Sequence, residues 1–201
     1  MTSKSTSTAF GIPAGRTLTI ASIIAGSLLI ALCAQISIDV PFSPVPITGQ
    51  TFGVLLVAAL LGLRQGTAAV VAYLAEGALG LPVFAGGAAG AQHLVGPTGG
   101  YLAGFVLAAL FVGFVLQRND RASLMTTILA MCGGTALIFA TGIGWLFAFS
   151  AIAGDSISSE VILNAALYPY LPGAGIKILA AAGMVAGTRT FIGRNSDKTS
   201  A

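Results

Sequence analysis

Long apolar runs limit what this chain can fold into more than any other feature. The run Leu18–Ile38 is long enough to cross the hydrocarbon core of a bilayer, which takes about 20 residues of helix. Charged residues make up 7% of the 201 positions, whereas soluble domains carry roughly 25%. The sequence therefore predicts an all-α integral membrane protein and is incompatible with a soluble globular domain.

Apolar segments alternate with turns that hold Gly, Pro or charge, at residues 18–38, 50–63, 66–80, 100–117, 123–150 and 173–193. We expect six transmembrane helices in a membrane domain at 16–194, flanked by a flexible cytoplasmic tail at 1–15 and a second tail at 195–201. The first segment is longer than the apolar core of a signal peptide, about 7–15 residues. The short second and third segments could instead form one long broken helix, although Arg64 between them favours a surface turn.

Basic residues indicate the orientation, because cytoplasmic loops carry an excess of Lys and Arg. Eight of the nine fall on one side of the predicted helices: Lys4, Arg16, Arg64, Arg118, Arg121, Arg189, Arg194 and Lys198. The opposite segments, 39–49, 81–99 and 151–172, contain neither Lys nor Arg. Both termini are therefore predicted to be cytoplasmic, with Lys177 the exception. Because these charges flank spans and form no stripe, a nucleic-acid partner is not expected.

The predicted outer segments 41–50 and 81–101 are rich in Gly and Pro, yet they are apolar. Solvated loops are usually polar, so we expect these segments to fold back into the protein as a lid or pocket wall. A tight buried connector is the alternative. Residues 156–170 alternate apolar and polar side chains, which predicts a short interfacial helix.

Motifs for chemistry are missing from the sequence. No G-x-x-x-x-G-K-[ST] loop for phosphate and no H-E-x-x-H zinc motif occurs. The single histidine, His93, has no obvious nucleophile near it, and Cys33 and Cys132 have no metal-ligand spacing and are interpreted as packing residues. We therefore expect no enzyme activity, no metal and no cofactor.

Lys177 is the most informative single residue, because it lies about one turn inside the start of the last predicted helix. A helix N-terminus carries roughly half a positive charge, so the lysine and the helix end together suit a carboxylate or phosphate. Snorkelling to the outer headgroups is the alternative. Glu76 is the only acid inside a predicted span, and it either faces the same cavity, meets interfacial water or pairs with Lys177.

Other side chains in the outer segments complete a candidate pocket for a small molecule. The candidates for hydrogen bonding are Gln50, Gln92 and Thr98, and the candidates for apolar walls are Phe84, Tyr101 and Tyr168. In the first helix, small residues recur at a spacing of four, as Ala21/Ala25 and Ser27/Ala31. Such a face permits close helix approach in lipid, either to a partner protein or within the bundle.

Four blocks resemble the BioY family in order and spacing: Phe42-Ser43-Pro44-Val45-Pro46-Ile47-Thr48-x-Gln50, Gly80-Leu81-Pro82-Val83-Phe84, Gly96-Pro97-Thr98-Gly99-Gly100-Tyr101 and Pro172-Gly173-x-x-Ile176-Lys177. The resemblance covers roughly residues 18–193. It implies a six-helix subunit of an energy-coupling-factor (ECF) importer in the bacterial cytoplasmic membrane, which binds biotin from outside. It also implies a transmembrane coupling protein and two cytoplasmic ATPases as partners, docking of the coupling protein on the first helix, and a binding role for Lys177.

One position departs from the family pattern, which often has Asp three residues before the lysine, where this chain has Ala174. Glu76 or Gln50 could supply the missing acceptor. The rival hypotheses are an equivalent subunit for another small vitamin, an intramembrane enzyme and a scaffold without a ligand. The enzyme would need clustered acids or histidines at the membrane face, and the scaffold would leave Lys177 unexplained.

Overall fold

The computed structural model describes residues 15–41, 43–119, 122–152 and 158–199. In chain order the elements are α1 (Arg16–Ala34), β1 (Ser37–Ile38), β2 (Ile47–Thr48), α2 (Gln50–Ala78), η1 (Ala85–Gly87), α3 (Gln92–Val95), α4 (Gly99–Gln117), α5 (Leu124–Ile152), α6 (Ser159–Ala166), η2 (Tyr168–Tyr170) and α7 (Leu171–Thr199). Five helical stretches are long and apolar enough to cross a membrane, if α2 is counted once. This confirms the predicted all-α membrane fold.

The element α2 consists of two helices that fold back on each other at Gly62. Its φ of 74° and ψ of −173° belong to a backbone region that is essentially restricted to glycine. We call residues 50–61 the first arm and residues 63–78 the second arm. The Gln50 amide donates to the Tyr73 hydroxyl at 2.5 Å, although 23 residues of straight helix would separate them by about 34 Å.

The arms of α2 are therefore antiparallel, and they supply the second and third of the six predicted helices. An added Cβ at Gly66 would lie 2.9 Å from the Cα of Ala58, so the arms touch backbone to backbone. The reversal occurs at Gly62, just before the predicted turn at residues 63–66. Both sequence interpretations were partly right, since the helix is broken and the break reverses the chain.

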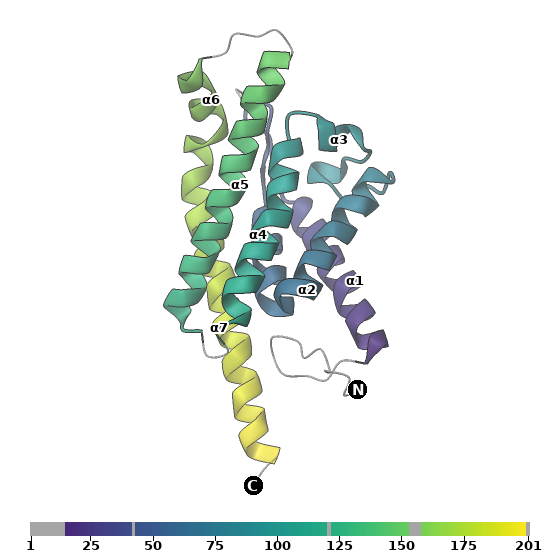
Figure 1. Ribbon diagram of the computed structural model, residues 1–201, viewed down its shortest axis with the longest axis vertical. Helices are drawn as coiled ribbons and strands as arrows, with labels where there is room; N and C mark the ends of the chain where they lie inside the picture. Colours follow the sequence, from purple (N-terminus) through teal and green to yellow (C-terminus); the bar gives the residue numbers. More distant parts are fainter. Residues whose placement is uncertain (1–14, 42, 120–121, 153–157, 200–201) are drawn as a thin grey trace.

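Several helix ends place described arginines on one side of the molecule. The start of α1, the end of α4, the start of α5 and the end of α7 lie together at the lower end in Figure 1. Arg16, Arg118 and Arg189 belong to these ends, and the Arg189 guanidinium donates to the Ala122 carbonyl at 2.7 Å. Lys4 and Arg121 lie outside the described residues.

The core is formed where α2 and α4 pack together, with α1 on one side and α5 and α7 on the other. Its largest fully buried side chains include Tyr73, Ile30, Leu55, Met131 and Ile138. Glycines allow the helices to approach closely: a Cβ at Gly104 would lie 2.9 Å from the Cα of Ile138. Of the two cysteines interpreted as packing residues, Cys33 is buried, but Cys132 is exposed.

The outer segments contain one element that was not expected, an antiparallel pair of two-residue strands in which Ser37 pairs with Thr48 and Ile38 with Ile47. The short helix predicted within 156–170 is present as α6, and the Ser158 hydroxyl caps it by accepting from the Val161 amide. The last helix begins at Leu171 and continues to Thr199, beyond the predicted end of the membrane domain at 194. The predicted tail at 1–15 lies outside the described residues except for Gly15.

Candidate functional site

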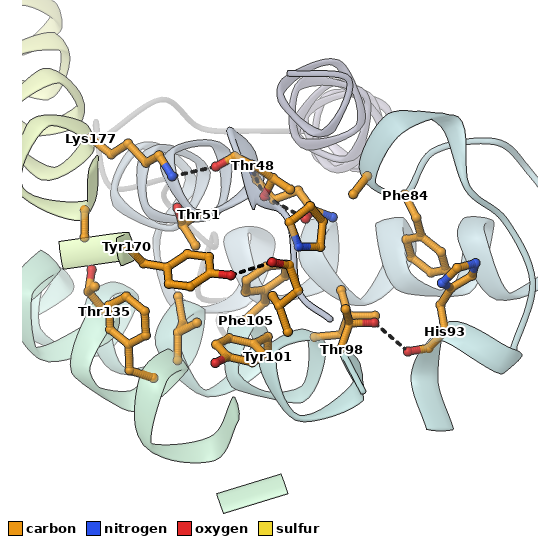
Figure 2. Close-up of a pocket in the computed structure, with 18 of the residues that line it drawn as sticks. Thr48, Thr51, Phe84, His93, Thr98, Tyr101, Phe105, Thr135, Tyr170 and Lys177 are labelled. Carbon is orange, nitrogen blue, oxygen red and sulfur yellow. Dashed lines mark hydrogen bonds between the residues drawn. The ribbon is translucent and has the colours of Figure 1, made fainter. Parts of the chain in front are cut away.

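A cavity with a volume of about 220 Å³ lies among α2, α4, α5, α7 and the outer segments. Most of its lining is apolar, as is usual for small-molecule sites. The polar side chains in the lining are Thr48, Gln50, Thr51, His93, Thr98, Tyr101, Thr135, Tyr170 and Lys177. Figure 2 labels all of them except Gln50 and shows them converging from elements that are far apart in the sequence.

The apolar outer segments form one wall of this cavity, as the sequence predicted. Pro44, Val45 and Pro46 line it from the segment before β2, and Phe84 lines it from the segment after α2. The Tyr170 hydroxyl donates to the Val45 carbonyl and lies 2.8 Å from the Ser43 hydroxyl. Tyr170 therefore ties the wall to the start of α7.

Lys177 enters the cavity from the second turn of α7. Its ammonium donates a hydrogen bond to the Thr48 carbonyl at 2.6 Å, so the side chain points into the protein and does not snorkel to the headgroups. Among the described residues that line the cavity, it is the only lysine or arginine. A lysine has three donors, and only one of them bonds to a described protein group. The others are available to an acceptor on a ligand.

Four further residues predicted for the pocket also line the cavity. Gln50 is buried at the start of α2, where its side-chain oxygen accepts from the Thr48 hydroxyl at 2.9 Å. Phe84 packs its edge against Tyr73, with 5.7 Å between ring centroids. The Thr98 hydroxyl donates to the His93 carbonyl at 3.2 Å, and the Tyr101 hydroxyl donates to the Ala166 carbonyl at 2.9 Å.

Three predicted pocket residues do not line the cavity. Glu76 accepts a hydrogen bond from the Ser27 hydroxyl at 2.5 Å, so it faces α1 instead of Lys177. Gln92 is exposed, and its amide donates to the Ala89 carbonyl at 2.7 Å. Tyr168 is 53% exposed. Their positions give no support for a binding role.

Several lining residues were not selected from the sequence, above all Thr135, Phe105, Phe139 and Tyr170. The only signal for Thr135 was a hydroxyl in an apolar span, which it shares with other residues of the same span such as Thr141. Phe139 packs on Tyr170, with 6.5 Å between ring centroids, a pairing across 31 positions that no local pattern reveals. His93 was considered only as a catalytic residue, yet its ring lies against Phe84 at 5.8 Å.

The two small-residue pairs of α1 lie on different faces. Ser27 and Ala31 are buried against α2, so they serve internal packing. Ala21 and Ala25 are exposed. They form a stripe with the exposed leucines of the same face, Leu18, Leu28 and Leu32.

A bundle of six apolar helices around one mostly apolar cavity, with one lysine and no arginine among the described residues of its lining, defines a polytopic membrane protein that binds a small molecule. The chain matches the model of the BioY family over residues 2–194. It therefore belongs to the BioY family.

Individual relatives agree with this assignment. The chain is 37% identical to the biotin transporter BioY of Rhodobacter capsulatus over 172 residues, which cover 80% of this chain and 90% of the relative. It is 45% identical to the biotin transporter BioY of Thermotoga maritima over 106 residues, or 53% of this chain and 62% of that relative. A crystal structure of the S-component for biotin from an ECF-type ABC transporter superposes with a TM-score of 0.77 at 27% identity, covering 87% of this chain and 92% of that one.

Proposed function

We propose that this protein is the biotin-binding membrane subunit of an ECF-type importer. The observation that carries the proposal is the cavity of a BioY-family bundle in which Lys177 is the only lysine or arginine among the described lining residues. Biotin has an apolar ring and chain between two polar ends, a ureido group and a carboxylate. A mostly apolar cavity with one cation and several hydroxyls complements such a molecule.

The apolar and the polar residues of the lining have different roles in binding. Leu55, Leu102, Phe105 and Ile138 are buried apolar side chains, and they remove the ring and chain of the ligand from water, which is favourable by about 25 cal/mol per Å² of apolar surface. Lys177 donates to an oxygen of the ligand, either in the carboxylate or in the ureido group. Hydrogen bonds to charged groups are worth about 1.5–3 kcal/mol, so the lysine supplies much of the affinity.

The subunit captures biotin and performs no chemistry on it. We propose that it lies in the bacterial cytoplasmic membrane with both termini in the cytoplasm, since the basic helix ends then face inward. The energy for transport comes from two cytoplasmic ATPases through a transmembrane coupling protein. The exposed stripe of α1 with Ala21 and Ala25 is the proposed docking face for that coupling protein, because its small side chains permit close helix approach.

The proposed function predicts that the purified protein binds one biotin per chain. Equilibrium binding in detergent or lipid nanodiscs measures this, with unlabelled small vitamins as competitors for labelled biotin. We expect biotin to displace the label and other vitamins to leave it bound. A chain that binds no biotin, or binds another vitamin more tightly, would be inconsistent with the proposal.

The docking face predicts a second result. Replacing both Ala21 and Ala25 with Leu should abolish co-purification with the coupling protein and leave biotin affinity unchanged, because these residues are exposed and neither of them lines the cavity. Ala103→Leu, at an exposed position of α4, is the matched control and should not affect assembly. Undiminished assembly of the double variant would place the docking face elsewhere.

A further inference from the structure

Thr135 has a buried hydroxyl without a hydrogen-bond partner. Its side chain is 7% exposed, and no partner for its oxygen is found among the described residues. Buried polar groups in folded proteins are nearly always paired, so an orphaned hydroxyl calls for a physical explanation. Thr135 also lines the cavity from the middle of α5 (Figure 2).

Other threonines in these helices pair their hydroxyls within their own helix. Thr127, Thr141 and Thr188 each donate to the carbonyl four residues earlier, at 3.1, 2.8 and 2.8 Å. A backbone carbonyl of the same helix is the usual partner of a helical threonine hydroxyl. Thr135 does not make it, so its hydroxyl is left free for a partner that is not part of the described chain.

A second threonine shows that an unpaired buried hydroxyl also occurs outside the cavity. Thr67, on the second arm of α2, also has a buried hydroxyl without a partner among the described residues, but it does not line the cavity. An unpaired hydroxyl by itself therefore does not identify a binding group. Thr135 combines the unpaired hydroxyl with a place in the cavity lining, and Thr67 becomes its natural control.

The surroundings of Thr135 indicate which kind of group it meets. Thr135 on α5 and Lys177 on α7 lie on the same side of the cavity in Figure 2, opposite Phe84 and His93, and α5 packs against α7. Both side chains can donate a hydrogen bond. Ala174, one turn before Lys177 on α7, also lines the cavity and contributes no polar side-chain atom. The matching ligand group is an oxygen that accepts from both donors.

We propose that the Thr135 hydroxyl donates a hydrogen bond to the same polar end of the ligand that Lys177 contacts. This inference rests on the proposed function and adds to it a neutral donor from α5. The ligand class is a mostly apolar molecule with a terminal carbonyl or carboxylate oxygen. In this chain, an acceptor of that kind completes the hydrogen bonding of the cavity wall.

The test compares Thr135→Val with Thr67→Val in equilibrium binding of biotin. Valine has nearly the shape of threonine and lacks the hydroxyl. We expect Thr135→Val to weaken binding about 2- to 13-fold, the range for loss of one hydrogen bond, and Thr67→Val to bind as the wild type does. Thr135→Ser keeps the hydroxyl and should retain most of the affinity.

Thermal unfolding of the ligand-free proteins excludes general damage as the cause. Removing an unpaired buried hydroxyl should leave the unfolding temperature of Thr135→Val equal to or above that of the wild type, because apolar replacement of such a group is neutral or stabilising. Weaker binding by a protein of undiminished stability supports the direct contact. If Thr135→Val does not fold, Thr135→Ala takes its place in both measurements.

A double-mutant cycle between Thr135→Val and Lys177→Met identifies the shared oxygen. Residues that bind one group should show non-additive losses, so additive losses would contradict a shared oxygen. Wild-type affinity in Thr135→Val overturns the hydroxyl contact and leaves biotin binding by the wild type intact. Failure of the wild type to bind biotin overturns both.

Discussion

Replacing Lys177 with Met is expected to weaken biotin binding about 10- to 150-fold, which corresponds to the loss of a hydrogen bond to a charged group. Methionine keeps the length of the side chain and removes the charge. The ammonium is held in the cavity by the Thr48 carbonyl at 2.6 Å, so it is already in place before the ligand arrives. Equilibrium binding with the purified variant measures the effect.

Comparing two ligands identifies the group that meets Lys177. Biotin and its uncharged methyl ester should be measured on the wild type and on Lys177→Met. If the wild type prefers the acid and the variant does not, the carboxylate is the partner, whereas equal losses for both ligands indicate the ureido oxygen. If the Lys177→Met variant folds and binds biotin with wild-type affinity, Lys177 is not part of the binding site.

Replacing Gly62 with Ala is expected to lower the free energy of unfolding by about 1–3 kcal/mol. The residue has a φ of 74° and a ψ of −173°, and a Cβ makes this conformation strained by that amount. The strain affects the chain reversal that brings Gln50, a residue of the cavity lining, next to Tyr73. Biotin binding should therefore weaken as well. Unfolding in detergent, followed by denaturant titration or heating, measures the change.

The matched control is Gly144→Ala. Gly144 lies within α5, and an added Cβ would meet nothing within 4 Å. Alanine is favoured over glycine inside a helix by about 0.5–1 kcal/mol, so this variant should be as stable as the wild type or more so. Equal stability of Gly62→Ala and Gly144→Ala would show that the reversal does not depend on the glycine.

The membrane architecture could be predicted because it follows from local composition. Apolar length gives the spans, and this requires no knowledge of which side chains touch. The sidedness indicated by Lys and Arg at the ends of the spans stays a prediction. The position of the reversal at Gly62 was harder to predict from the sequence, since Gly62-Leu63 looks like the continuation of an apolar helix. Contacts between the two arms, such as that of Gln50 with Tyr73, show that the chain turns back there.

The candidate site was predicted in part, because the sequence does not tell in which direction a side chain on a largely apolar helix points. Ala21 and Ser27 are six residues apart, which is about 240° of rotation around α1, so one faces outward and the other faces α2. Tyr168 and Tyr170 differ in the same way within one turn of η2. Site residues in the outer segments were easier to predict, since the unusual Gly and Pro content of these segments marked Phe84 and Thr98 directly.

The folded-back α2 has a consequence for the lipid around it. At 1.5 Å per residue the first arm is about 18 Å long and the second about 24 Å, whereas α1 and α4, with 19 residues each, reach about 28 Å. A hydrocarbon core is about 30 Å thick. Beside α2, the leaflet on the side of Gly62 must therefore dip toward the exposed Arg64, or that side chain must stretch toward the phosphates. Hydrophobic mismatch is thus built into one side of the bundle, and the surrounding bilayer should be thinner there than beside α4.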